Sequence, residues 1–305
     1  MQKSREKYIY ILSCAQNGGI YRYSFQNGEL IFKDKTPLNR PMYAIIRENK
    51  LYVILREIDE ATHFGGLLSF DIDENSVVIV RAHGVAPQII KLLEKTGCTI
   101  INATCPRVLS NQKRAADFAK RQFAVIIAGD KNHGEVTGLE GFVKEFCSEC
   151  YVIENTKDAE ILSNQICQNS SINKDNIVLL SQTTISATEY ESIGKVLKEK
   201  FPSIQILNTI CPATTERQEA LKKLCAQVDG VVVIGGKSSA NTCRLFSMAQ
   251  DFSENPEYRC KFACHIENPC ELPKEFFSLE VVGLTAGAST PDEVILSVEK
   301  SLYCN

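Results

Sequence analysis

The sequence predicts an α/β protein in which parallel sheets alternate with helices. The first indication is a series of short apolar runs that alternate with stretches of helical periodicity from Ser76 onwards. The second is that these runs lack the polar alternation of half-exposed strands, so both faces are expected to be covered by helices. The third is a repeat within the chain. Before Ser76 the sequence pattern differs, and we expect antiparallel strands there.

Residues 1–75 are expected to form an antiparallel β meander, because short aromatic and β-branched runs are joined by turn signals such as Gln26-Asn-Gly28. The expected strands are Tyr8–Cys14, Gly19–Phe25, Glu29–Phe32, Met42–Glu48, Leu51–Arg56 and Gly66–Ile72. Gly19–Phe25 recurs as Gly66–Ile72, and through these strands the segment resembles the opening of the six-phosphogluconolactonase-like β-propeller family. Too few strands are present to close a propeller, so a plain β-hairpin extension is an equally good interpretation.

Residues 76–305 are expected to form the α/β region, without a low-complexity linker. The expected strands are Val77–Val80, Thr99–Ala103, Val125–Ala128, Ile177–Leu180, Ile204–Ile210, Val231–Ile234 and Val281–Leu284. The expected helices are Gln88–Lys95, Asn111–Arg121, Thr188–Lys200, Arg217–Gln227, Thr242–Phe252 and Asp292–Ser301.

Two stretches of the α/β region, about 99–176 and 204–280, repeat each other. Self-similarity at a fixed period indicates a repeated structural unit. The aligned pairs are Cys105 with Cys211, Gly129 with Gly235, His133 with Ser239, Glu135 with Asn241, and Asn155 with Asn268.

Each repeat carries a cysteine where a helix is expected to begin. Proline suits the first helical position, so Cys211, which precedes Pro212, is expected near the N-cap, and Cys105 precedes Pro106 in the same way. At a helix N-terminus the unpaired amides and the helix dipole favour the thiolate over the thiol. Thiolates suit a soft metal or an iron–sulfur cluster.

Composition excludes several classes of function. The 305 residues have a formal net charge of −3, so the chain lacks the excess of basic residues that is typical of nucleic-acid-binding proteins. No apolar run reaches the length of about 18 residues that a membrane span needs. The apolar patch after the charged N-terminus is only Tyr8–Leu12, so we expect no signal peptide and a cytoplasmic location.

The 13 cysteines do not form a disulfide framework, since the number is odd and thiols stay reduced in the cytoplasm. Two groups could be interpreted as metal clusters, but neither has a partner pair at zinc-site spacing. They are Cys147 with Cys150, and Cys260 with Cys264 and Cys270.

Small, polar or titratable residues follow nearly every expected strand. In α/β sheets ligands bind outside the carboxyl ends of strands, where helix N-termini point their amides. If the repeated units face each other, these residues are expected to line one cavity. Taken singly, each residue could have a purely structural role. His83 could be a histidine whose hydrogen bonds stabilise a turn, and Ser239, Asn241 and Ser289 could merely cap helices.

Seven ordered motifs carry a family resemblance. They are Arg81-Ala-His-Gly-Val85, Ala103-Thr-Cys-Pro106, His133-Gly-Glu-Val136, Gln182-Thr-Thr184, Thr209-Ile-Cys211, Gly235-Gly-Lys237 and Thr285-Ala-Gly-Ala-Ser-Thr-Pro291. From about Val78 onwards the chain resembles 4-hydroxy-3-methylbut-2-enyl diphosphate reductases. The resemblance implies a trefoil of parallel α/β units, the first incomplete here, around a central [4Fe–4S] iron–sulfur cluster.

The resemblance also implies roles for individual residues. Cys105 and Cys211 would be cluster ligands, Glu135 would relay a proton, and Thr183 would lie beside the substrate. The substrate diphosphate would be held by His83, His133, Ser239, Asn241 and Ser289. Ferredoxin or flavodoxin would donate the electrons, and the products would be isopentenyl and dimethylallyl diphosphates.

The front of the chain departs from the family pattern. The family supplies its first cluster cysteine from an N-terminal motif that is absent here, and a further diphosphate-binding histidine follows it. Cys14 is the only cysteine before Cys98, and His63 matches no family motif. Two functions therefore stay open: the iron–sulfur reductase, or a non-catalytic fusion or truncation product that keeps the α/β scaffold. With Cys105 and Cys211 alone, a cluster is expected to assemble poorly, so the choice depends on Cys14.

Overall fold

The computed structural model describes residues 8–13, 19–26, 29–37, 41–47, 50–55, 66–71, 76–80, 82–237, 239–288 and 290–303. By its contacts the chain divides into two compact units, Met1–Val152 and Ile153–Asn305. The expected boundary between residues 75 and 76 stays a prediction. From β7 (Ser76–Val80) onwards, helices alternate with strands, and the strand pairs β7–β8, β11–β12, β13–β14 and β13–β15 are parallel, which confirms the α/β class.

Two sheets lie in the first unit. The larger has the order β3-β2-β1-β7-β8 and the smaller the order β4-β5-β6. Their strands are β1 (Tyr8–Ser13), β2 (Gly19–Gln26), β3 (Glu29–Pro37), β4 (Pro41–Arg47), β5 (Lys50–Leu55), β6 (Gly66–Asp71), β7 (Ser76–Val80) and β8 (Thr99–Asn102).

The expected antiparallel pairing of residues 1–75 is confirmed for the described strands. β2 pairs antiparallel with β1 and β3, and β5 does so with β4 and β6. β1 also pairs in parallel with β7, where Tyr8 lies opposite Ser76, and β7 pairs in parallel with β8. The first three strands of the meander therefore extend the sheet that contains the parallel pair β7–β8, whereas β4, β5 and β6 form a sheet of their own.

The rest of the first unit positions its part of the site. Its elements are α1 (Pro87–Lys95), α2 (Pro106–Lys120), β9 (Ala124–Ala128), α3 (Gly134–Lys144) and β10 (Cys150–Ile153). Every residue of β9 is buried, as its unbroken apolar sequence predicts, and α2 packs against both β9 and α3. The N-termini of α2 and α3 follow the ends of β8 and β9 in the chain.

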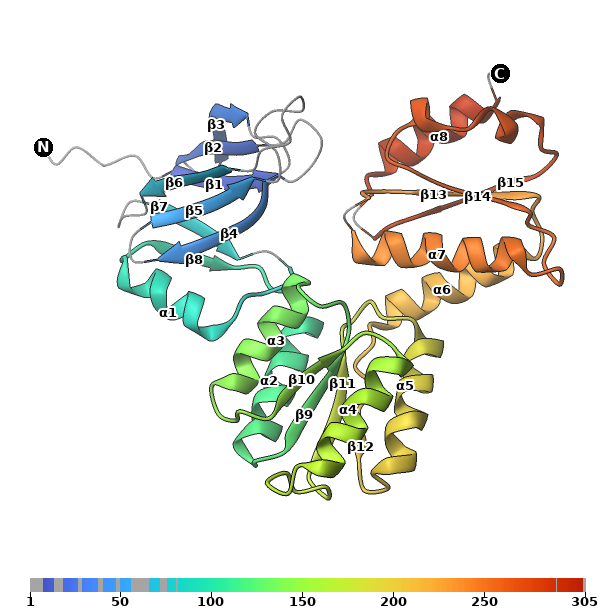
Figure 1. Ribbon diagram of the computed structural model, residues 1–305. Helices are drawn as coiled ribbons and strands as arrows, with labels where there is room; N and C mark the ends of the chain where they lie inside the picture. The colour runs from blue at the N-terminus through green and yellow to red at the C-terminus, as the bar shows by residue number, and fades with distance from the viewer. Residues whose placement is uncertain are drawn as a thin grey trace, which may run out of the picture. The chain divides into compact units, whose positions relative to one another are not determined.

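The second unit contains a three-stranded parallel sheet of order β14-β13-β15 and the parallel pair β11–β12. Helices α7 and α8 cover opposite faces of the three-stranded sheet (Figure 1). Its elements are α4 (Thr156–Gln168), β11 (Ile177–Ser181), α5 (Ala187–Lys200), β12 (Gln205–Ile206), α6 (Pro212–Cys225), β13 (Gly230–Ile234), α7 (Ala240–Glu254), β14 (Phe262–Ile266), two 3₁₀ turns (Pro269–Glu271 and Lys274–Ser278), β15 (Val282–Ala286) and α8 (Asp292–Tyr303).

A core of apolar side chains fixes α6 and α7 against β13. Val231 and Val233 are fully buried with Leu221 of α6 and Leu245 of α7. Burying a side chain of this size stabilises a fold by about 1.5–3 kcal/mol. The N-termini of both helices are thereby fixed relative to the sheet.

One expected strand is wrong. Ile204–Ile210 was expected as a buried strand, but β12 covers only Gln205 and Ile206, and both are exposed. Beyond Leu207 the backbone no longer pairs with β11, because the Thr209 hydroxyl accepts a hydrogen bond from the backbone N–H of Ser181 at 2.7 Å. This side-chain bond replaces the next rung of the sheet.

The two repeated stretches share the succession strand, helix, strand, helix, strand, after which the first continues with α4 and the second with the two 3₁₀ turns. Cys105 and Cys211 are both N-caps of helices with proline in the first turn, as the Cys-Pro sequence indicates. His133 and Ser239 are the N-caps of the next helices, α3 and α7.

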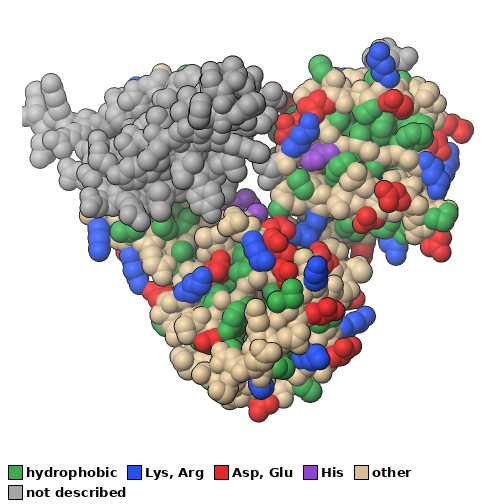
Figure 2. Space-filling view, viewed as in Figure 1, with side chains coloured by type: hydrophobic (Ala, Val, Ile, Leu, Met, Phe, Trp, Pro, Cys, Tyr) green, Lys and Arg blue, Asp and Glu red, His purple; other side chains and the backbone are tan. Residues whose placement is uncertain are grey.

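The described surface carries both signs of charge. Lysine and arginine side chains are interspersed with acidic ones over the face shown in Figure 2. Among the helices that the structure describes, none has the length and apolar character that crossing a bilayer requires.

Candidate functional site

His83 lies in a turn directly after β7. The turn is possible because Gly84 adopts φ +69°, in the left-handed region that suits glycine. The Cys105 N–H donates to the Ala82 carbonyl at 2.9 Å, and Ala103 N–H donates to the Val80 carbonyl at the same distance. The loops that follow β7 and β8 are therefore bonded to each other, which brings the Cys105 backbone beside the His83 turn.

Cys105 is the N-cap of α2, and its thiol is half-buried and outside any disulfide. Its own carbonyl accepts the first helical bond, from Leu109 N–H at 2.9 Å. The thiol is thus held at the N-terminus of α2, the positive end of the helix dipole.

His133 and Glu135 are joined at the start of α3. Asn132 has φ +69°, a left-handed conformation that asparagine tolerates, and this turn places His133 at the N-cap. The His133 Nδ1 accepts from the Glu135 backbone N–H at 3.3 Å, so in the neutral ring the proton is on Nε2. Glu135 itself is only 1% exposed. An imidazole donor and a buried carboxyl group therefore share one helix N-terminus.

The two histidines of the first unit lie side by side. The ring centroids of His83 and His133 are 4.9 Å apart in an edge-to-face arrangement. His83 follows β7 and His133 begins α3, so the pair depends on how closely that turn approaches that helix. Two neighbouring imidazoles form an arrangement suited to an anion such as a phosphate.

In the second unit, Cys211 and Thr183 are bonded through their backbones. The Cys211 N–H donates to the Thr183 carbonyl at 2.9 Å, which ties the α6 N-terminus to the loop after β11. Thr183 is buried, whereas the Cys211 thiol is half-buried and outside any disulfide. Cys211 therefore has the same N-cap position, partial burial and free thiol as Cys105.

Ser239 and Asn241 occupy the first turn of α7. The Ser239 hydroxyl caps the helix by accepting from the Thr242 N–H at 3.4 Å. Asn241 is 9% exposed, and its Nδ2 has no hydrogen-bond partner among the described residues. A buried amide donor without a partner is costly, and such groups in native structures call for an explanation such as a ligand.

Two glycines allow the α7 N-terminus to approach the sheet. A Cβ on Gly287 would lie 2.1 Å from the Thr242 Oγ1, and one on Gly235 would lie 3.1 Å from the same atom. Gly235 also has φ +144°, a conformation that other residues rarely adopt. The Gly235-Gly-Lys237 and Thr285-Ala-Gly287 motifs thus have a packing reason in this unit.

The structure therefore assembles the predicted residues within each unit. His83, His133, Glu135 and the Cys105 backbone come together in the first unit, and Thr183 with Cys211, and Ser239 with Asn241, in the second. Ser289, Cys14 and His63 lie outside the described residues. The prediction that all of these residues line one cavity stays a prediction.

The other cysteine groups have different surroundings. The Cys147 thiol donates to the Phe123 carbonyl, and burial raises the pKa of Cys150 to about 12. Burial also raises the pKa of Cys264 to about 12. A thiol that keeps its proton is a poor metal ligand. Within the described ranges no three or more His, Cys, Asp or Glu side chains gather as a metal site would require.

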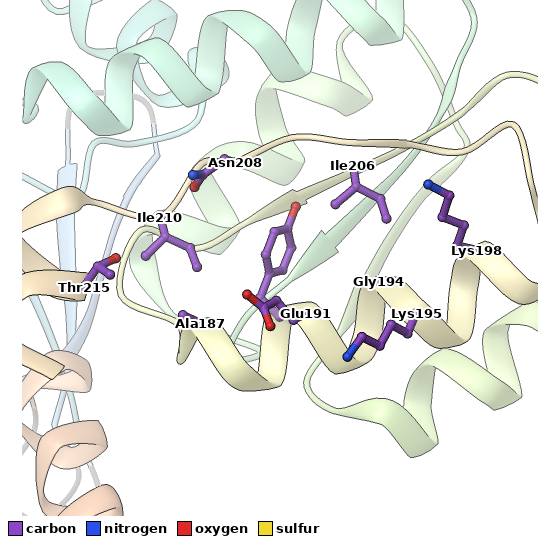
Figure 3. Close-up of a pocket in the computed structure, with 10 residues that line it drawn as sticks. Ala187, Glu191, Gly194, Lys195, Lys198, Ile206, Asn208, Ile210 and Thr215 are labelled. Carbon is purple, nitrogen blue, oxygen red and sulfur yellow. The ribbon is translucent and has the colours of Figure 1, made fainter. Parts of the chain in front are cut away.

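A pocket of about 500 Å³ lies in the second unit between α5 and the segment from β12 to the start of α6 (Figure 3). Lys195 and Lys198 of α5 line it together with Ile206 and Ile210. None of the predicted site residues lines this pocket, although Ile210 directly precedes Cys211.

Sequence reasoning missed two buried polar residues beside the site. They are Gln112 in α2 and Thr242 in α7, exposed by 2% and 1%. Each has a polar side-chain atom without a partner among the described residues: Gln112 Nε2 and Thr242 Oγ1. The available signal was a polar residue on the apolar face of an expected helix. Gln112 is the second residue of the helix that was expected to begin at Asn111.

Comparison with known proteins gives a consistent family. The model of the LytB protein family matches residues 40–303. This match begins before Val78, where the resemblance carried by the seven motifs was expected to start. A protein of Treponema denticola named 4-hydroxy-3-methylbut-2-enyl diphosphate reductase is 46% identical over 231 residues, which cover 75% of this chain and 74% of that protein. A Treponema pallidum protein of the same name is 38% identical over 243 residues, but the chain spans only 60% of its length.

Two solved structures resemble the fold. The E-1-hydroxy-2-methyl-but-2-enyl-4-diphosphate reductase from Plasmodium falciparum superposes with a TM-score of 0.63 and 29% identity, covering 74% of this chain and 66% of that one. A structure described as (E)-4-hydroxy-3-methyl-but-2-enyl diphosphate reductase, the terminal enzyme of the non-mevalonate pathway, has a TM-score of 0.51 and 31% identity, covering 76% and 77%. These matches favour the reductase over a non-catalytic scaffold.

Proposed function

Because the chain belongs to the LytB protein family, we propose that it reduces (E)-4-hydroxy-3-methylbut-2-enyl diphosphate to isopentenyl and dimethylallyl diphosphates. The reaction adds two electrons and two protons and releases the hydroxyl group as water. The observation that carries the proposal is the cluster of His83, His133 and the buried Glu135 beside the Cys105 N-cap. It combines anion donors, a buried carboxyl group and a cysteine at a helix N-cap within one unit.

The substrate's diphosphate is held by hydrogen-bond donors at helix N-termini. His83 and His133 present imidazoles, and Ser239 and Asn241 lie in the first turn of α7. The positive ends of helix dipoles and the exposed amides there favour an anion. The unpartnered Asn241 Nδ2 supports this role, because a phosphate oxygen would supply the missing acceptor. We assign Ser289 to the same anion from its motif.

Glu135 supplies the proton that the leaving hydroxyl needs. Its burial excludes bulk water as a competing proton donor, and its backbone N–H fixes His133. Protonation of the hydroxyl lets it leave as water. We assign Thr183, whose carbonyl accepts from the Cys211 N–H, a place beside the substrate from its motif.

The residues present fit an iron–sulfur cluster. Cys105 and Cys211 are free, half-buried thiols at helix N-caps, the donor type that such clusters use. When bound, a [4Fe–4S] cluster would supply electrons and a Lewis-acidic iron for the hydroxyl oxygen. The remaining protein ligand is Cys14 if any cysteine before Cys98 provides it, because Cys14 is the only one there.

Iron content of single cysteine variants tests this ligand set. After anaerobic reconstitution, Cys105→Ser and Cys211→Ser should lose most of the bound iron. Cys167→Ser, an exposed cysteine of α4, is the matched control and should keep it. Loss of iron in Cys14→Ser would identify Cys14 as a ligand, whereas full iron in both Cys105→Ser and Cys211→Ser would reject the assignment.

The electrons come from a small redox protein of the ferredoxin or flavodoxin class, and the cytoplasm is the proposed location. The activity itself is tested by incubating the reconstituted chain with the substrate under reducing, oxygen-free conditions. Both product diphosphates should form with dithionite as donor. A cluster-loaded chain that forms neither product would contradict the proposed function.

A further inference from the structure

Gln112 is a buried polar residue in the second turn of α2, the helix that Cys105 caps. Its side chain is 2% exposed, and it lies on the packed face of the helix with Val108, Ala115 and Ala116. Its Nε2 has no hydrogen-bond partner in the part of the chain that the structure describes. An apolar residue would be the simpler choice at such a position, so the amide calls for another reason.

The Gln112 amide touches two glycine backbones. A Cβ built on Gly84 would lie 2.5 Å from Gln112 Nε2, and one built on Gly138 would lie 3.1 Å from the same atom. A Gly138 Cβ would also come within 3.8 Å of the His83 carbonyl oxygen. The amide is therefore enclosed between the turn that carries His83 and the first half of α3.

These two backbones carry the paired histidines. Gly84 directly follows His83, and Gly138 lies about one turn after His133 and Glu135 in α3. The distance of 4.9 Å between the His83 and His133 rings thus depends on how closely the turn approaches α3. The terminal amide of Gln112 occupies the space between the Gly84 turn and α3.

We propose that Gln112 is a positioning residue that sets the separation of His83 from His133 and thereby the affinity for the diphosphate. The inference rests on the proposed function. His133 and Glu135 are bonded to each other within α3, so a change at Gln112 moves His83 relative to both of them. Substrate binding should therefore change more than the chemical step.

Gly138→Ala tests the proposal from the side opposite Gln112. The only tight contact of the added methyl group is with the flexible end of the Gln112 side chain, at 3.1 Å, while the His83 and Val85 backbones lie at an ordinary van der Waals distance of 3.8 Å. The variant should therefore fold, and alanine favours the helix. The displaced amide then presses on the Gly84 turn. We expect the KM for the substrate to rise roughly tenfold while kcat stays near the wild-type value, since small displacements of binding groups have effects of this order or larger.

A second readout does not depend on activity. The chain has four histidines, so the Cε1–H resonances of His83 and His133 can be assigned by NMR through His→Gln variants. Gly138→Ala should shift both resonances and leave that of His265, in the second unit, unchanged. Shortening the amide in Gly138→Ala/Gln112→Asn should return both resonances and the KM towards the wild-type values.

Gly194→Ala is the matched control. It also adds a methyl group to a helical glycine, in α5, where the Cβ would lie 3.2 Å from the terminal methyl group of Ile206. Its KM and its His83 and His133 resonances should match those of the wild type.

The proposal is overturned if Gly138→Ala leaves the KM and both resonances unchanged, or if Gln112→Asn in that background restores neither. Failure of the proposed function has a different signature. A wild-type chain without reductase activity would reject that function, while the resonances would still report whether Gln112 separates the two rings.

Discussion

Glu135 combines burial with a position directly beside an imidazole, and both properties suit a proton donor. Glu135→Gln keeps the side-chain shape and removes the titrating group, so substrate binding should persist. Turnover should fall by roughly 10²–10⁴-fold, as is typical for a lost general acid. A dithionite-driven assay measures this, with Glu140→Gln on the same helix as a control that should keep full turnover. Unchanged turnover in Glu135→Gln would exclude Glu135 as the proton source.

Asn241 should show opposite effects on stability and on binding. Asn241→Leu removes a buried donor that has no partner among the described residues, so thermal stability should be equal to or higher than that of the wild type. A lost hydrogen bond to a charged phosphate should cost about 1.5–3 kcal/mol, which raises the KM roughly ten- to a hundredfold. Calorimetry and steady-state kinetics measure the two effects. A lower Tm with an unchanged KM would make Asn241 a structural residue.

The individual site residues could be predicted because the chemistry of short motifs is local. A Cys-Pro step indicates a cysteine at a helix N-cap, and both Cys105 and Cys211 have that position. Gln112 could not be predicted in this way, because its significance comes from Gly84 and Gly138, which approach it from other parts of the chain. Sequence patterns do not record such contacts.

At the scale of elements, Asp229 joins the beginnings of all three strands of the β14-β13-β15 sheet. Its carboxylate accepts from Arg259 Nε at 2.8 Å and from Val281 N–H at 2.9 Å, and its carbonyl accepts from Lys261 N–H at 2.8 Å. The side-chain hydrogen bond from Arg259, followed by that from the Val281 backbone, lowers the pKa of Asp229. The ionised form therefore stabilises the folded unit.

The pH dependence of stability tests the Asp229 contribution. Because the folded-state pKa is lowered, the stabilisation is present above the unfolded-state pKa of about 3.9 and is lost as the pH falls through the folded-state value. Asp229→Asn should lower the urea midpoint near neutral pH, and the difference from the wild type should shrink in acid. Asp251→Asn, an exposed residue of α7, is the control. A difference that persists unchanged in acid would show that the charge is not the cause.

Prediction of the elements succeeded where periodicity was strong and failed where it was weak. The buried strands β9, β11 and β13 were expected at nearly their observed bounds, since buried parallel strands have nearly continuous apolar sequences. Helix α3 was missed because Gly138 and Gly141 lower its helix propensity. Gly141 lies so close to Ala86 that an added Cβ would come within 2.2 Å of the Ala86 Cβ. Tertiary packing thus overrides local preference in this helix.

At the scale of the whole molecule, the pairing of β1 with β7 is the feature that sequence patterns could not supply. It places Tyr8 opposite Ser76, residues far apart in the chain, and so connects the first three strands of the meander with the α/β region. The LytB family match likewise begins at residue 40, within the stretch expected to form the antiparallel meander. Non-local pairing depends on the whole fold and leaves no local signature.

The most direct test of the account is the number of electrons consumed for each product molecule formed by the full 305-residue chain. The anaerobically reconstituted protein is supplied with substrate and a measured amount of dithionite, and both product diphosphates are quantified. Reductive loss of the hydroxyl group predicts two electrons per molecule of isopentenyl or dimethylallyl diphosphate, and no product without the donor. A cluster-loaded chain that consumes electrons without forming either product, or that leaves the substrate unchanged, would contradict the assignment.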